Sequence, residues 1–419
     1  MNHPSNRTHF LQALGPGLIW AAAAIGVSHL VQSTRAGAVY GFSLTAVILL
    51  ALLLKYPFFE FGPRYAAATG ESLIEGYARQ GRWAVWVYLF LTLATMFAVV
   101  GAVTFVTGSL ATQLFGAGLS PLAYSALFLV ICALLLIKGR YALLDGLVKA
   151  IIVVLTLSTV AAVIAVLSAG APPRVAEAVP AELLGAAGFA FLIALVGWMP
   201  SAVDVSVWHS LWTLERAKQT GHAPTVEESL LDFNIGYIGT GVLALLFLSL
   251  GALVIYGTGV EIATAGGAFA AQLIETYTTA LGPWSRWIIA IAAFTTMFST
   301  TLTCTDAFPR ALSQVTATLG GEKCQRYVSA LYWVWMLVLL SGSLLLISIF
   351  RGYLINMIDL ATTLSFLTSP VLGYLNYRAV TAKHMPDGTT PPAWLRVLSW
   401  AGLAFGVGFS IAFLVWRFG

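Results

Sequence analysis

The segment AIGVSHLVQST, residues 24–34, places polar side chains in the middle of an otherwise apolar stretch. Ser28 and His29 lie where a helix that crosses a membrane would meet hydrocarbon. Polar groups are tolerated at that depth only where protein or a water-filled cavity satisfies them. Gly26 has the conformational freedom to bend the backbone at this point. We therefore predict that the segment unwinds at Gly26 and lines a cavity.

The surrounding composition indicates a membrane protein. The chain has 419 residues, of which 59% are hydrophobic and 9% are charged, whereas a soluble domain carries about 25% charged residues. Apolar runs recur at about the 20 residues that cross a hydrocarbon core. We predict an all-α, polytopic membrane protein with eleven transmembrane helices. The expected spans lie near residues 14–39, 42–63, 83–113, 120–138, 141–169, 183–212, 230–257, 285–314, 327–349, 353–377 and 394–416.

The loop charges predict an orientation, because Lys and Arg accumulate on the cytoplasmic side of a membrane protein. Most loop Lys and Arg fall on the side that carries the N-terminus, and the opposite side holds Arg174, Arg286, Arg351 and Arg417. The pattern predicts a multi-pass protein of the cell (inner) membrane with a cytoplasmic N-terminus. The expected partners are the lipid bilayer and a small-molecule or ion substrate, without nucleic acid. Because the sequence has no nucleotide-binding loop and no catalytic cluster, we expect neither an enzyme nor a cofactor.

A second interruption occurs in the sixth span. Gly197 and Pro200 bracket Trp198-Met199, and a proline opens a helix because it removes a backbone donor and clashes with the preceding turn. Two interrupted helices, each the first of five spans, predict an inverted repeat with a substrate site at the midplane. Repeat one is then residues 14–169, repeat two is 183–377 and an extra helix is 394–416, all within one domain spanning 1–419. The alternative interpretation is a pair of ordinary kinks.

Short motifs in the chain are similar to those of a known transporter family. They are Gly15-Pro16-Gly17, Ala36-Gly37-Ala38, Tyr40-Gly41, Thr69-Gly70 with Leu73 and Glu75, and Met199-Pro200. They resemble the natural resistance-associated macrophage protein (Nramp) family of proton-coupled divalent-metal transporters. The resemblance implies the LeuT-type five-plus-five fold with broken helices 1 and 6. It also implies a divalent metal cation as the substrate.

The sequence departs from this family at its metal site. Where the family has Asp-Pro-Gly-Asn, the aligned stretch here is Gly26-Val27-Ser28-His29, and Met-Pro-His becomes Met199-Pro200-Ser201. The remaining candidate metal ligands are His29, Met199 and Asp204, a set that suits a transition metal better than a hard ion. The candidate substrate-binding residues are Gly26, Ser28, His29, Val196, Met199, Ser201 and Asp204.

Two other functions remain open. The helix N-termini after each break suit anions, and Arg35 lies nearby, so the cavity is also compatible with a small organic solute such as an amino acid or carboxylate. Trp198 and Trp208 would then pack against the apolar part of that solute. A non-transporting sensor on the same scaffold is the third possibility.

Coupling to H⁺ or Na⁺ is expected on the cytoplasmic side of the breaks. Lys149 and Asp306 lie at similar depths, about 12 Å from the cytoplasmic ends of their spans at a rise of about 1.5 Å per residue, so we predict an ion pair or hydrogen bond between them. Ser299, Thr300 and Thr303 offer oxygens to Na⁺. The alternative is that these hydroxyls bond to carbonyls of their own helix.

Overall fold

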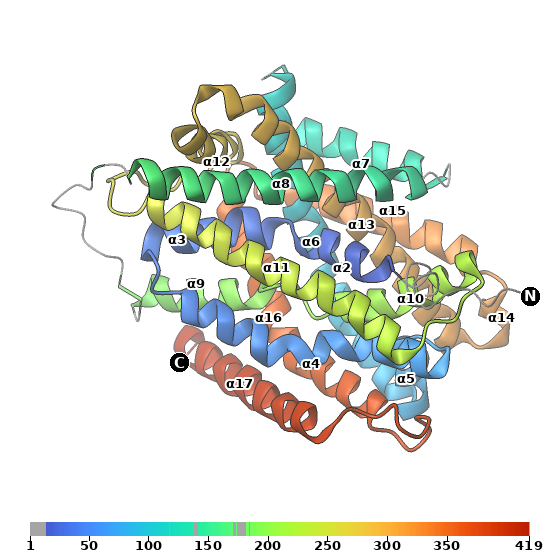
Figure 1. Cartoon of the computed structure of the whole chain (residues 1–419). Coiled ribbons are helices and arrows are strands. Elements are labelled where there is room, and N and C mark those ends of the chain that lie inside the picture. Colours follow the sequence, from blue (N-terminus) through green and yellow to red (C-terminus); the bar gives the residue numbers. More distant parts are fainter. Residues whose placement is uncertain are drawn as a thin grey trace, which may run out of the picture.

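The computed structural model describes residues 14–116, 118–137, 141–170, 173, 182–183 and 185–418, without the side chains of residues 141–152 and 169. All secondary structure in this part of the chain is helical (Figure 1). Seven of the helices there are long and apolar enough to cross a membrane. They are α4 (Thr45–Thr69), α6 (Arg82–Phe115), α11 (Val226–Val254), α13 (Arg286–Gly320), α15 (Val328–Ile349), α16 (Leu354–Val380) and α17 (Ala393–Phe418).

The other predicted spans are two further apolar helices and two broken helices. The first pair consists of α7 (Pro121–Ile137) and α8 (Tyr141–Ala169). The first broken span consists of α2 (Pro16–Ala24), the π-helix η1 (Ser28–Ser33) and α3 (Thr34–Tyr40), and the second consists of α9 (Ala186–Trp198) and α10 (Val205–Thr220). Both predicted interruptions are therefore confirmed, and each of the eleven predicted spans corresponds to one of these elements.

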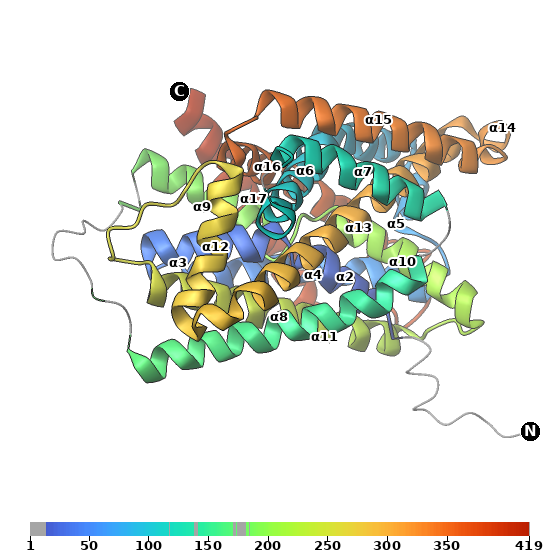
Figure 2. The same cartoon turned by 90° about the horizontal axis from the view of Figure 1, so that it is seen from above.

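The sequence analysis missed four shorter elements. They are α5 (Leu73–Gln80), α12 (Gly266–Leu281), η2 (Pro283–Ser285) and α14 (Glu322–Gln325). The start of α5 carries a recognisable signal, because Ser72 and Glu75 form a capping box in which the Glu75 carboxylate accepts from the Ser72 amide at 2.6 Å. The helix α12 runs across its neighbours instead of along them (Figure 2). With 16 residues, α12 is shorter than a membrane span.

The long helices lie side by side around the broken ones. In Figure 1, α4, α8 and α11 run roughly parallel across the molecule, and α11 contacts both of the others. The C-terminal end of α17 lies at one end of the bundle, and α5 and α14 lie at the opposite end. The broken helices α2 and α3 pack against α11, and α9 packs against α16. The interior of the bundle therefore surrounds both breaks.

The motif Gly15-Pro16-Gly17 attaches the first broken helix to α11. The Asp232 carboxylate accepts hydrogen bonds from the amides of Gly15 at 3.1 Å and of Gly17 at 2.6 Å. These are among the N-terminal amides that a helix leaves without an internal partner. A Cβ atom on Gly17 would overlap the backbone of Asp232. Glycine is therefore required for α2 to come this close to α11.

Two further glycines bring α3 onto α11. A Cβ atom on Gly37 would overlap the carbonyl oxygen of Leu248, and one on Gly251 would overlap the carbonyl oxygen of Thr34. Close backbone approach through small residues is a common means of helix association in membranes. The outer half of the first broken span is held in place by this contact.

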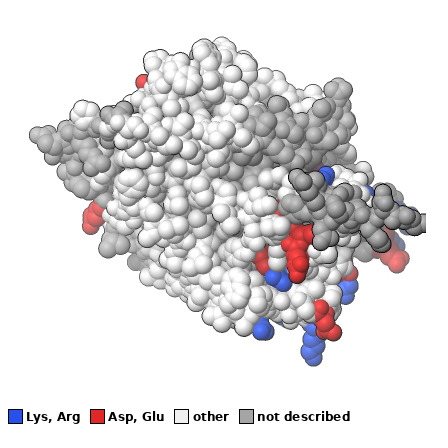
Figure 3. Space-filling model, viewed as in Figure 1, with Lys and Arg blue, Asp and Glu red and all other residues white. Residues whose placement is uncertain are grey.

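The surface is that of a protein embedded in a bilayer. The face in Figure 3 is mostly uncharged, and its Lys, Arg, Asp and Glu side chains gather at the lower right, toward the end that carries α5 and α14. Large apolar side chains are exposed on several long helices, among them Phe90, Leu157, Leu337 and Leu414. Such a surface is incompatible with water on all sides, so the chain is a multi-pass membrane protein.

Replacing a glycine by alanine should affect stability at Gly37, which lies in the contact between α3 and α11, but not at Gly239, which lies outside it. Gly37→Ala should lower the melting temperature of the detergent-solubilised protein, because overpacking against a backbone atom costs about 1–3 kcal/mol. The matched control is Gly239→Ala on α11, where a Cβ atom meets open space. There alanine should leave the melting temperature unchanged or raise it. Equal melting temperatures for both variants would contradict the packing described.

The expected orientation can be tested with the cysteines. Cys324 is partly exposed, whereas Cys132 and Cys304 are buried. If the N-terminus is cytoplasmic, a membrane-impermeant maleimide should label Cys324 only after the cells are permeabilised. In a Cys324→Ser background, Glu261→Cys lies in an exposed connection on the opposite side and should be labelled in intact cells. The reverse pattern of labelling would invert the orientation.

Candidate functional site

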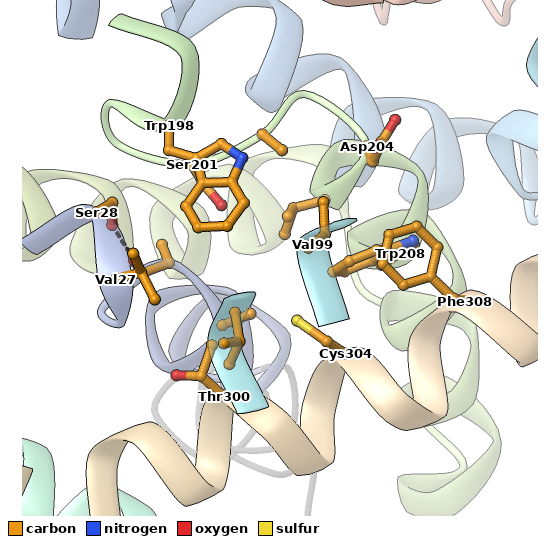
Figure 4. Close-up of a pocket in the computed structure, with 15 residues that line it drawn as sticks. Val27, Ser28, Val99, Trp198, Ser201, Asp204, Trp208, Thr300, Cys304 and Phe308 are labelled. Carbon is orange, nitrogen blue, oxygen red and sulfur yellow. Dashed lines mark hydrogen bonds between the residues drawn. The ribbon is translucent and has the colours of Figure 1, made fainter. Parts of the chain in front are cut away.

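A cavity lies between the two breaks. It is lined by residues from α2 and η1, from α6, from the α9–α10 break and from α13. Figure 4 shows Val27, Val99, Trp198 and Cys304 approaching one common space from these four elements. Its volume is about 30 Å³, and about 10–15 Å³ of such space holds one water molecule. In this conformation the cavity therefore admits a small ion or about two water molecules.

One carboxylate lines this cavity. Asp204 lies in the non-helical segment before α10, and its Oδ1 atom is buried without a hydrogen-bond partner among the described residues. Its Oδ2 atom accepts a long bond from the Thr95 hydroxyl at 3.4 Å. No Lys or Arg is among the described residues that line the cavity. The cavity is therefore suited to a positive charge beside Asp204.

The carbonyls freed by the first break bind hydroxyl groups. The Ser28 hydroxyl donates to the Ala24 carbonyl at 2.6 Å. The Thr300 hydroxyl lies 3.1 Å from the Ala22 carbonyl oxygen and 3.3 Å from that of Ile25. Gly26 lies directly against Thr300, so that a larger side chain would displace it. Gly26 and Thr300 were both predicted site residues, and they meet where α13 packs against the first break.

The carbonyls freed by the second break bind the ammonium group of Lys55. Its Nζ atom donates to the carbonyl oxygens of Val196 at 3.1 Å, Gly197 at 3.0 Å and Ser201 at 2.8 Å. These bonds use all three donors of an ammonium group. Val196 was a predicted substrate ligand, but its carbonyl is bonded to Lys55 and the residue does not line the cavity. The Ser201 carbonyl is bonded in the same way, although Ser201 itself lines the cavity.

The three candidate metal ligands do not meet in this structure. The His29 ring is fully buried, with Nε2 at 2.9 Å from the Thr240 carbonyl oxygen and Nδ1 at 2.7 Å from the Ser28 hydroxyl. Met199 packs in a separate apolar cluster with Phe191 and Phe366. Of the three, Asp204 lines the cavity. The described residues contain no group of three His, Cys, Asp or Glu side chains arranged for a metal.

The predicted coupling residues have partners of their own. The Asp306 carboxylate accepts from Arg310 at 2.9 and 2.8 Å and from the Tyr332 hydroxyl at 2.8 Å. The side chain of Lys149 lies outside the described residues, so its predicted bond to Asp306 stays a prediction. The Thr303 hydroxyl donates to the Ser299 carbonyl at 2.9 Å, which is the local bond that was considered as the alternative to an ion site.

Arg35 forms an ion pair beyond the cavity. It donates to both carboxylate oxygens of Asp359 at 2.7 and 3.1 Å, and Gln32 donates to the same carboxylate at 3.3 Å. The guanidinium group also lies 4.7 Å from the ring centroid of Phe191. This contact joins α3 to α16 and α9. The positive charge of Arg35 is therefore paired, and Arg35 does not serve the cavity as the organic-solute interpretation expected.

Sequence reasoning missed part of the cavity wall. Val99, Val103, Cys304 and Phe308 line it, and the Trp208 and Phe308 rings meet edge to face at 4.8 Å. Thr300, Cys304 and Phe308 recur every four residues, which is the spacing of one helix face. Because Thr300 was a predicted site residue, this spacing could have identified Cys304 and Phe308 as lining residues. Val99 and Val103 on α6 are also four residues apart. The sequence does not distinguish them from the other apolar residues of that helix, so they could not have been predicted.

Comparisons with known proteins identify relatives over almost the whole chain. The family model described as natural resistance-associated macrophage protein-like matches residues 17–416. A Pasteurella multocida (strain Pm70) protein named uncharacterized protein PM0681 is 36% identical over 410 residues, covering 97% of this chain and 93% of that one.

Solved structures with the same fold are more distant in sequence. The Eremococcus coleocola manganese transporter, in complex with an aromatic bis-isothiourea substituted compound, has a TM-score of 0.71 and 14% identity, covering 98% of this chain and 88% of that one. MhsT in complex with L-phenylalanine has a TM-score of 0.57 and 14% identity, covering 99% of each chain. These likenesses establish the LeuT-type fold, in agreement with the two broken helices.

The contacts of Lys55 predict that its ammonium group stabilises the second break. Lys55→Met preserves much of the side-chain volume but leaves carbonyls buried without a donor, at about 1–3 kcal/mol per group. The melting temperature in detergent should therefore fall by several degrees. Lys218→Met removes an exposed lysine and serves as the control, with no expected change. A Lys55→Met protein as stable as the Lys218→Met protein would contradict this role.

Proposed function

Since the chain belongs to the natural resistance-associated macrophage protein-like family, a family of secondary transporters and not of enzymes, we propose that its cargo is a small cation. A divalent metal ion is the first candidate. The observation that carries this proposal is Asp204, which lines the cavity between the two broken helices and has a buried Oδ1 atom without a hydrogen-bond partner among the described residues. A charge at membrane depth usually faces a cavity or a partner, and here the partner is the cargo.

The charges around the cavity favour a cation over an anion. Lys55 is directed toward the carbonyls of the second break, and Arg35 is paired with Asp359. Attraction between opposite charges strengthens where water is excluded. A carboxylate-bearing solute would meet Asp204 without a compensating Lys or Arg among the described lining residues. The anionic version of the organic-solute hypothesis is therefore the weaker one.

The available donor atoms favour a hard metal ion. Asp204 supplies carboxylate oxygen, and Ser28 and Ser201 supply hydroxyl oxygens at the two breaks. Mg²⁺ and Mn²⁺ bind such oxygens and retain water in the remaining positions. The softer donors, His29 and Met199, are bonded or packed elsewhere. Mn²⁺ is the first probe, because the Eremococcus coleocola protein of this fold is named a manganese transporter.

A small organic cation is the second candidate. Much of the cavity wall is apolar, and Trp198, Trp208 and Phe308 contribute aromatic rings. Aromatic faces attract organic ammonium groups, and a carboxylate would bind the same charge. The fold also accommodates organic ligands, as in MhsT with L-phenylalanine. A sensor that binds the cation without moving it is the third candidate.

The coupling ion is proposed to bind at the first break. The Thr300 hydroxyl converges with the carbonyl oxygens of Ala22 and Ile25, and three such oxygens suit Na⁺. Proton coupling is the alternative. Uptake of external cargo into liposomes separates the two, because an inward Na⁺ gradient without a pH gradient should drive uptake in the first case alone.

Replacing Asp204 tests the cargo. Asp204→Asn should reduce cation-dependent thermal stabilisation and uptake into liposomes at least about tenfold, since the loss of one charged contact exceeds about 1.4 kcal/mol. The ligands are Mn²⁺, Mg²⁺ and a set of organic ammonium compounds, each measured against the unmodified protein. Asp387→Asn changes an exposed aspartate in the connection before α17 and should leave both measurements unchanged.

The outcomes separate the candidates. Stabilisation by Mn²⁺ or Mg²⁺ that disappears in Asp204→Asn supports the metal, and stabilisation by ammonium compounds alone supports the organic cation. Binding without uptake identifies a sensor. Uptake that is unaffected by Asp204→Asn would place the cargo elsewhere and overturn the proposal.

A further inference from the structure

A second pocket lies at the end of the molecule that carries α5 and the α16–α17 connection. Its volume is about 320 Å³, much larger than the central cavity. We call it the basic pocket, and it is lined by Arg79, Gln80, Arg378, Thr381, Lys383 and His384, together with Ala382. No carboxylate is among its lining residues in the described part of the chain. The pocket is therefore an accumulation of positive charge that the transport site does not use.

Part of this charge is balanced within the protein. Arg79 donates to both carboxylate oxygens of Glu71 at 2.7 and 2.5 Å. Its hydrogen bond lowers the pKa of Glu71, so that this carboxyl group is charged at neutral pH. The His384 ring lies 2.9 Å from the Tyr65 hydroxyl, which fixes one side of the pocket.

The rest of the charge is unbalanced. Arg378 and Lys383 are exposed and form no salt bridge within the described residues. Arg378 lies in the last turn of α16, and Lys383 lies five residues farther on. Two cations that face one concave site without a protein partner match an anionic ligand. Because guanidinium and ammonium groups both bind phosphate oxygens strongly, a phosphate group is the natural ligand.

The position of the pocket indicates where that phosphate comes from. On α16, Val371 and Tyr374 are 41% and 39% exposed, and with Arg378 they follow the i, i+3, i+7 spacing of one helix face. On α6, the exposed residues Trp83, Trp86 and Phe90 repeat that spacing. Tryptophan is typical of the boundary between hydrocarbon and headgroups. Both faces are exposed, largely apolar stripes, as surfaces that face lipid are.

The two stripes are joined at the pocket. The Gln80 side-chain amide donates to the Leu375 carbonyl on α16 at 2.9 Å, and the Trp83 indole donates to the Gln80 carbonyl at 3.1 Å. The end of α5, the start of α6 and the end of α16 are thus fixed against one another. A lipid whose acyl chains lie along these stripes would bring its headgroup to Arg378 and Lys383.

We propose that the basic pocket binds the phosphate-bearing headgroup of an anionic membrane lipid. Basic pockets between membrane helices on the cytoplasmic side are suited to such headgroups, and the predicted orientation places this end of the molecule in the cytoplasm. The bound lipid would link the α5–α6 corner to the end of α16. Because the pocket shares no residue with the central cavity, this proposal is independent of the cargo.

The test compares lipids on the purified full-length protein. In detergent supplemented with phosphatidylglycerol, the melting temperature should rise by several degrees relative to phosphatidylcholine, and native mass spectrometry should show retained phosphatidylglycerol. The double variant Arg378→Gln/Lys383→Gln should bind phosphatidylglycerol at least about tenfold more weakly. The matched control is Lys323→Gln/Arg326→Gln, which removes two exposed charges around α14 at the same end of the molecule and should bind as the unmodified protein does.

The second part of the experiment uses inorganic phosphate and glycerol 3-phosphate, which test whether the ligand is a free phosphate compound. If they stabilise the protein through Arg378 and Lys383 and phosphatidylglycerol does not, the ligand is a free phosphate compound and the lipid proposal is overturned. Equal loss of lipid binding in both double variants would indicate nonspecific attraction to charge and would also overturn it. If the pocket variant fails to fold, displacement of retained phosphatidylglycerol from the unmodified protein by phosphatidylcholine decides the question, since ready displacement contradicts a specific site.

Discussion

The hydrogen bonds from the Lys55 ammonium group to three main-chain carbonyls are the contact on which the central site depends. A break in a membrane helix exposes backbone groups that hydrocarbon cannot satisfy. At the second break these groups belong to Val196, Gly197 and Ser201, and one side chain from α4 satisfies all of them. The segment from Met199 to Asp204 remains non-helical as a result. Asp204 can therefore face the cavity instead of lying within a helix.

The two breaks are satisfied by different chemistry. Hydroxyl groups of Ser28 and Thr300 serve the first break, and the side-chain nitrogen of Lys55 serves the second. Because Lys55 occupies the carbonyls of the second break, these oxygens are not available to a cargo. The free charge that remains in the described cavity wall is that of Asp204. This asymmetry supports the proposals that the cargo binds beside Asp204 and that the coupling ion binds at the first break.

The departures from the family's metal motif have a structural counterpart. His29 stands where the family has asparagine, and its ring bonds to α11 instead of facing the cavity. Met199 keeps the family's residue but packs with Phe191 and Phe366. Neither residue therefore lines the cavity, whose wall is mostly apolar. The chain shares the scaffold of its family, and the proposed cargo site differs from the family's motif in relying on oxygen atoms.

The sequence by itself determined the architecture and the location of the site. Apolar runs of about 20 residues indicate membrane helices, and Gly26 and Pro200, each beside a cluster of polar residues, indicated where two of these helices break. Tertiary structure alone decided which polar groups face the cavity. His29 and Asp204 are both polar residues beside a break, but the His29 ring bonds to a carbonyl of α11, whereas the buried Oδ1 atom of Asp204 has no hydrogen-bond partner among the described residues. Likewise, Lys55 and Arg35 acquired partners 141 or more residues away. The physical reason is that local sequence sets where a backbone bends, whereas the direction of a side chain depends on the helices that pack around it.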